Sequence, residues 1–156
     1  MSAGSNERLF RELIIQKFGN NCLSGKKRFS IGLDDFPKVS ISVDESIEKN
    51  DKTILIEIDS GNMAKLIAGQ YALLNGMYGG DRTKTLFLVI HYYQDGKTHA
   101  LYNRDRTLKN LNAIRHFNPK ANWISFNAYN IEEFQEILDN SNSLESLITE
   151  IWDKRN

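Results

Sequence analysis

The stretch that decides the fold runs from Lys38 to Asp59 and reads KVSISVDESIEKNDKTILIEID. Its first part alternates apolar and polar residues, and this pattern predicts a half-buried strand over 38–44. Its last part, 53–59, is rich in Ile and Leu and predicts a second strand. The polar residues 48–52 lie between the two, so we expect a β-hairpin.

The position of the turn fixes which side chains of this hairpin face one another. With the turn centred on 50–51, Asp44 lies opposite Glu57, and Ser42 lies opposite Asp59. Side chains alternate with period two along a strand, so both pairs share one side of the hairpin. We therefore expect three carboxylates on one face of two adjacent strands. A register slip of one residue would remove this arrangement.

Clustered carboxylates repel one another, and a fold keeps them when a cation compensates their charge. Mg²⁺ takes oxygen ligands and retains waters that a substrate phosphate can replace. We therefore expect Asp44, Glu57 and Asp59 to bind Mg²⁺, with Mn²⁺ as a substitute. In the alternative interpretation, Asp44 and Asp59 are solvated strand-end acids and only Glu57 lies inside a strand.

The rest of the chain supplies further helices and strands in an order typical of a layered domain. Helices are expected at 7–18, 63–75, 106–117, 131–138 and 144–152, and strands at 29–32, 85–93, 99–102 and 123–127. The sequence therefore predicts a single α/β domain over 1–156, with a central mixed β-sheet flanked by helices. Its core is expected at about 38–128.

The segment from Ser42 to Tyr71 resembles the core of the PD-(D/E)xK nuclease superfamily. In that family an acid on one strand is followed by acid-x-lysine on the next strand and then by a helix packed on the sheet. Asp44, Glu57 and the helix that contains Gln70 match this order. The resemblance implies a restriction-endonuclease-like domain and a Mg²⁺-dependent, restriction-type endonuclease that hydrolyses phosphodiester bonds in DNA.

This sequence departs from the family pattern at the lysine, whose place is taken by Asp59. An acid there implies metal binding or activation of water. The missing cation would then come from Lys65 on the following helix, or from Lys38 on the first strand. Family members also often place an acid of the first helix near the metal, and Glu12 is the best match. If no cation is supplied, the implied alternative is a non-catalytic binding or assembly module.

The charge balance limits how the chain could bind DNA. Twenty Lys plus Arg equal twenty Asp plus Glu, so any binding needs a local basic face. The candidate groups are 26–28, Arg82 with Lys84, and Arg104 with Arg106, Lys109 and Arg115. The resemblance also implies either a larger sequence-recognising subunit or a second copy of this chain as a partner.

The remaining features of the sequence suggest an ordinary intracellular protein. Cys22 is the only cysteine, so the chain cannot form an internal disulfide or a zinc site built from several cysteines. No apolar run approaches the length of a membrane span. We expect a cytoplasmic protein that does not interact with membranes.

Overall fold

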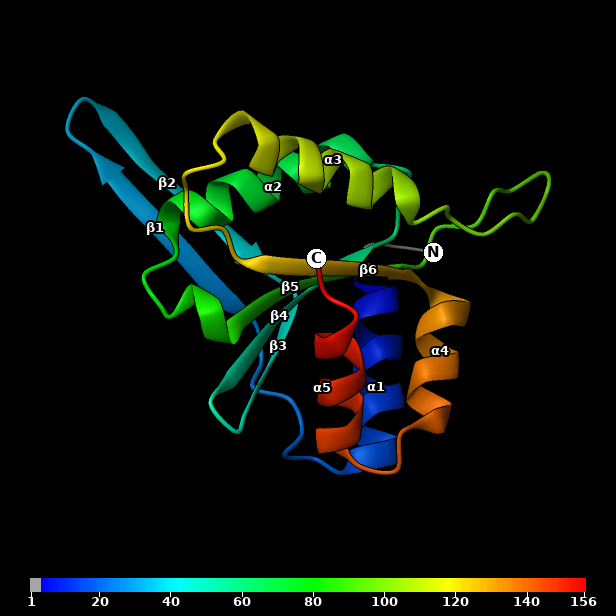
Figure 1. Cartoon of the computed structure of the whole chain (residues 1–156). Coiled ribbons are helices and arrows are strands. Elements are labelled where there is room, and N and C mark those ends of the chain that lie inside the picture. The colour runs from blue at the N-terminus through cyan, green and yellow to red at the C-terminus, as the bar shows by residue number, and fades with distance from the viewer. Residues whose placement is uncertain (1–3) are drawn as a thin grey trace.

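The computed structural model describes residues 4–156, and of Leu33 only the backbone. A four-stranded sheet lies between two layers of helices, and a two-stranded arm projects from it (Figure 1). The helices are α1 Ser5–Phe18, α2 Ala64–Met77, α3 Asp105–Phe117, α4 Ile131–Asn140 and α5 Leu144–Asp153, and a short 3-10 helix, η1, covers Arg82–Lys84. The strands are β1 Lys27–Leu33, β2 Phe36–Val43, β3 Glu45–Lys49, β4 Lys52–Asp59, β5 Thr85–His91 and β6 Ser125–Asn130.

The main sheet is mixed, as the sequence predicts. Its strand order is β3-β4-β5-β6, with β3 antiparallel to β4 and the other neighbours parallel. Helices α1, α4 and α5 cover one face, and α2 with α3 covers the other (Figure 1). The α/β architecture with a central mixed sheet flanked by helices is therefore confirmed.

Alternation along β4 divides the core between these two faces. Ile54, Ile56 and Ile58 pack with α1, α4 and α5, whereas Leu55 packs with α2 and α3. Strand β5 is buried along its whole length, as expected for a parallel strand covered on both faces. Because Glu57 is two residues beyond Leu55, its side chain lies on the α2 side of the sheet.

The predicted turn is confirmed, and so is the predicted register between residues 45–49 and 52–56. Asn50 and Asp51 both have positive φ, 51° and 61°, as a two-residue turn of type I′ requires. Lys49 pairs with Lys52, and the register continues to Glu45 opposite Ile56. The regular pairing ends at Glu45: the N–H of Asp44 also points to the carbonyl oxygen of Ile56, so the predicted sheet pair of Asp44 with Glu57 does not form, although the two residues remain neighbours.

The segment before Asp44 differs from the prediction. The strand expected over 38–44 was to pair with 53–59, but two separate strands, β2 and β3, lie on either side of Asp44. Strand β3 pairs with β4, whereas β2 bends away at Asp44 and pairs with β1. Ser42 consequently lies opposite Arg28 and not opposite Asp59. Most of β2 is exposed on both faces, so no buried face holds it to the main sheet. None of the helices in residues 4–156 has the length and apolar character needed to cross a bilayer.

Candidate active site at the end of strand β4

Asp44 and Glu57 form an acid pair where β2 leaves the sheet. The backbone N–H of Asp44 donates to the carbonyl oxygen of Ile56 at 3.0 Å. The Oδ2 atom of Asp44 accepts from the backbone N–H of Ile58 at 2.9 Å. The Asp44 carboxylate thus accepts the hydrogen bond from Ile58 that a backbone carbonyl of β2 would accept if β2 continued along β4. These two hydrogen bonds fix Asp44 beside Glu57.

Glu57 is the most strongly perturbed acid of this pair. Its Oε2 atom is buried and accepts no hydrogen bond from any residue that the structure describes. Burial, and next the charge of Asp44, raise the pKa of Glu57 to about 8, and the nearby Gln70 amide opposes this shift. Glu57 therefore holds a proton at neutral pH unless a cation compensates its charge.

The environment of Asp44 identifies the charges that face the pair. Burial raises the pKa of Asp44, while the hydrogen bond from Ile58 and the positive charge of Lys26 lower it, and Glu7 raises it further. Lys26 also lowers the pKa of Glu57. Lys26 is thus the cation that acts on both acids.

Lys26 was expected only as a DNA contact, but the strand pairing explains its position. Lys27 pairs with Val43, so the residue before Lys27 reaches the residue after Val43, which is Asp44. This neighbour could have been found from the sequence only by predicting that the basic segment 26–28 begins a strand antiparallel to β2.

Asp59 does not complete a set of three carboxylate ligands. Its Oδ2 atom lies 2.8 Å from Nδ1 of His91 on β5, and its Oδ1 atom accepts from the Gly61 N–H at 3.1 Å. His91 Nε2 lies 2.9 Å from the Thr107 hydroxyl, and the His91 ring stacks on Tyr102 at 3.8 Å. Asp59 is buried, so it is not a solvated strand-end acid either.

The physical reason for this outcome is the parallel pairing of β4 with β5. Asp59 and His91 are partners in that register, and a buried carboxylate gains more from a hydrogen-bonded imidazole than from facing other acids. The expected cradle of three carboxylates is therefore reduced to the pair Asp44 and Glu57.

Glu12 and Lys65, the other predicted catalytic residues, are both exposed. Glu12 does not approach the acid pair and instead pairs with Arg8 at 3.8 Å on the exposed side of α1. The acid of α1 that interacts with Asp44 is Glu7. Lys65 is exposed in the first turn of α2.

Gln70 connects the pair to α2. Its Nε2 atom donates to the Ser42 carbonyl oxygen at 3.2 Å, which ties the helix to the end of β2 close to Glu57. Lys65, Ser42 and Gln70 also line one shallow cavity of about 410 Å³. Lys65 therefore shares a cavity with Gln70 but is not among the charges that act on the pair, and Lys38 is exposed on the arm.

Two carboxylates are available for a metal ion. Among residues 4–156, no three His, Cys, Asp or Glu side chains form a group that could hold one. Asp44 and Glu57 nevertheless suit a hard divalent cation, because Mg²⁺ commonly binds one or two carboxylates together with water and substrate phosphate. The buried, unpartnered Oε2 atom of Glu57 is an oxygen that such a cation would satisfy.

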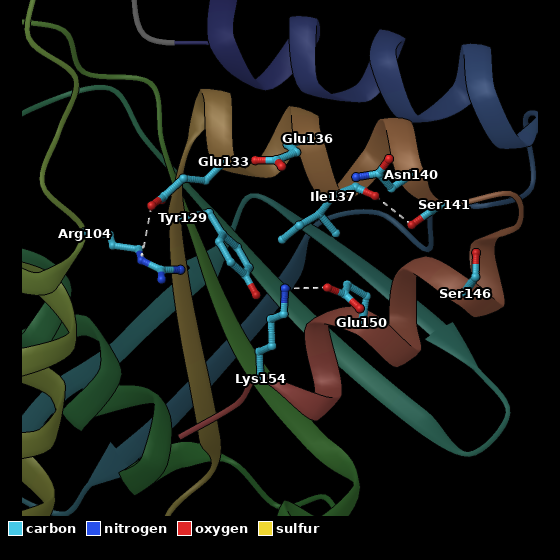
Figure 2. Close-up of a pocket in the computed structure, with 10 residues that line it drawn as sticks. All are labelled: Arg104, Tyr129, Glu133, Glu136, Ile137, Asn140, Ser141, Ser146, Glu150 and Lys154. Atoms are coloured by element: carbon cyan, nitrogen blue, oxygen red, sulfur yellow. Dashed lines mark hydrogen bonds and ion pairs between the residues drawn. The ribbon is translucent and has the colours of Figure 1, made fainter.

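A separate cavity of about 530 Å³ lies between α4, α5 and β6 (Figure 2). Four of its five charged side chains form two pairs: Arg104 pairs with Glu133 at 3.4 Å, and Lys154 pairs with Glu150 at 2.5 Å. The fifth is Glu136, so the cavity offers no uncompensated positive charge to an anionic ligand.

The chain matches no protein-family model, and no curated protein or solved structure is similar enough to it to count as a match.

Proposed function

We propose that this protein is a metal-dependent endonuclease that hydrolyses phosphodiester bonds in DNA. The observation that supports this most directly is the pair of Asp44 and Glu57, with the buried Oε2 atom of Glu57 lacking a partner among the described residues. The order of hairpin, helix α2 and buried parallel strand β5 is also the order that the resemblance implies.

Each residue of the site has a distinct part in the proposed reaction. Asp44 and Glu57 would hold Mg²⁺ or Mn²⁺, and the ion would supply Lewis-acid chemistry toward water and the phosphodiester. Lys26 places positive charge beside both acids, where it stabilises negative charge in the transition state. Gln70 keeps the Glu57 carboxylate oriented.

Asp59 acts indirectly in this proposal. Its hydrogen bonds to His91 and Gly61 fix the end of β4, so it positions Glu57 and is not itself a metal ligand. Lys26, and not Asp59, replaces the lysine of the family pattern. Lys65 contacts substrate from the cavity that it shares with Gln70.

The experiment is cleavage of supercoiled plasmid DNA with Mg²⁺ or Mn²⁺. Asp44→Asn and Glu57→Gln should abolish cleavage while retaining the wild-type circular dichroism spectrum. Lys26→Met should lower the rate about 100-fold, as expected for loss of one transition-state donor. Lys97→Met is the matched control, because Lys97 is exposed in a distant loop. Wild-type rates in both acid variants would rule out the proposal.

The proposed DNA nuclease acts with either a larger sequence-recognising subunit or a second copy of itself. Adding a partner subunit should convert single-strand nicks into double-strand breaks, and a self-associating enzyme should be a dimer by analytical ultracentrifugation at the concentrations at which it cleaves. Double-strand cleavage by a monomer without any partner would contradict both arrangements.

The second candidate function is a non-catalytic binding or assembly module with the same fold. It is favoured by one observation: the position of the family lysine is occupied by Asp59, which is hydrogen-bonded to His91. Calorimetry with Mn²⁺ separates the two candidates. A module without activity has no need of a cation at Asp44 and Glu57, so heat of binding that Glu57→Gln abolishes favours the nuclease.

A further inference from the structure

A third cavity, of about 380 Å³, lies between the first turn of α2 and helix α3. Its lining offers three cationic side chains and two side-chain amides, but no carboxylate. The lining residues are Asn62, Met63, Ala64, Lys65, Arg106, Lys109 and Asn110.

The positive charges of this cavity are not compensated. Within the described part of the chain, Lys65, Arg106 and Lys109 form no ion pair, whereas other surface lysines do, such as Lys49 with Glu145 at 3.0 Å. Three like charges that line one cavity repel one another, and an anion relieves that repulsion. The absence of an acid here is notable in a chain with equal numbers of acids and bases.

Arg106 is held in place before any ligand arrives. Its Nη1 atom donates to Oδ1 of Asn62, and its guanidinium lies 5.6 Å from the centre of the Tyr102 ring. A guanidinium fixed in this way loses less conformational entropy on binding an anion. Its remaining N–H groups suit the oxygens of a phosphate.

Lys65 and Gln70 lead from this cavity toward the acid pair. Lys65 lines both this cavity and the shallow one that contains Ser42 and Gln70. Gln70 lies beside Glu57. A nucleic-acid strand that presents one phosphate to Asp44 and Glu57 can therefore place another phosphate beside Arg106.

We infer that this cavity between α2 and α3 binds a phosphate group of a nucleic-acid strand, close to the phosphodiester that is cut. The identity of the ligand rests on the proposed nuclease function. The chemistry required is a tetrahedral oxyanion that accepts from Lys65, Arg106 and Lys109. Either a terminal 5′-phosphate or an internal backbone phosphate supplies it.

The test is fluorescence anisotropy with labelled DNA duplexes in EDTA, so that no cleavage occurs, over a series of KCl concentrations. One duplex carries a 5′-phosphate and the other a 5′-hydroxyl. Lys109→Gln and Arg106→Gln are compared with wild type, and Lys97→Gln is the control. Loss of one phosphate contact should reduce the slope of log K against log salt by about 0.9, and affinity near 0.1 M salt about fivefold to tenfold.

Weakening confined to the 5′-phosphorylated duplex supports the site and assigns it to a strand end. Equal weakening on both duplexes supports it and assigns an internal phosphate. Wild-type affinity and slope in both variants overturn the inference, and so does failure of the wild-type protein to bind either duplex.

Cleavage by the same proteins separates the failure of this inference from the failure of the proposed function. Normal binding by both variants together with Mg²⁺-dependent cleavage by wild type overturns the phosphate site alone. Reduced salt slopes in the variants, with no cleavage by wild type under any divalent metal, overturn the nuclease proposal and leave a nucleic-acid-binding site.

Discussion

Replacing Glu57 with glutamine should remove most of the pH dependence that this carboxyl imposes on folding. Burial and the neighbouring Asp44 raise its pKa from 4.5 to about 8. One pKa unit corresponds to about 1.4 kcal/mol, so this rise corresponds to about 5 kcal/mol at most. Part of the side chain reaches solvent, which lowers the expected value to about 3 kcal/mol.

The sign follows from the direction of the shift. The folded protein binds this proton more tightly than the unfolded chain does, so protonated Glu57 adds stability below pH 4.5. That stability is lost progressively as the pH rises from 4.5 to about 8, and the loss is complete above that range. In Glu57→Gln the neutral amide replaces the titrating group, so this decline is absent.

The assay is urea unfolding followed by circular dichroism, without divalent metal, at several pH values from 5 to 9. The quantity compared is the free energy of unfolding of Glu57→Gln minus that of wild type, which should rise by about 3 kcal/mol across this range. Glu12→Gln, which changes an exposed acid of α1 and leaves Glu57 in place, is the control. Parallel pH profiles for wild type and Glu57→Gln would refute the assignment of a buried, protonated carboxyl.

Two further predictions concern neighbouring charges. Because Glu57 holds a proton below pH 8, binding of Mn²⁺ at pH 7 should release about one proton; calorimetry in two buffers of different ionisation enthalpy measures this, and identical heats would count against it. Arg11→Met should destabilise the fold by about 2 kcal/mol, because it leaves the buried Glu45 without its cation. Arg8→Met, which removes an exposed pair, should change the urea midpoint little, and equal effects of the two substitutions would contradict this reasoning.

Local patterns were sufficient to predict much of the fold. The apolar run of β5 and the Asn50-Asp51 turn each encode their structure within a few residues, so the hairpin register followed from the turn. The expected strand at 99–102 forms only a single bridge, between Gln94 and Leu101. Its alternation is too short to compete with the turn around it.

Contacts between distant segments were harder to predict. The break at Asp44 depends on β1, which offers β2 a partner outside the main sheet. The apolar residues Met63 and Leu66, at the start of α2, are 52% and 64% exposed. Ile67 and Tyr71 of the same helix are buried.

The candidate site shows the same difference between features that local patterns predict and features that depend on contacts between distant segments. Hairpin register alone predicts that Asp44 and Glu57 lie together, and the two acids do interact, although the regular pairing of β3 with β4 ends before Asp44. The partner of Asp59 depends on the parallel register between β4 and β5, which no local pattern encodes. Lys26 likewise reaches the pair only through the pairing of β1 with β2.

Anomalous scattering from a crystal soaked in Mn²⁺ tests most directly whether the two acids at the end of β4 hold a divalent ion. We expect one strong peak between residues 44 and 57, with a carboxylate oxygen of each about 2.1 Å from the ion. The peak should disappear in crystals of Glu57→Gln. A soaked wild-type crystal with no peak at this pair, or with manganese bound only elsewhere, would contradict the proposed metal site and the hydrolytic function that depends on it.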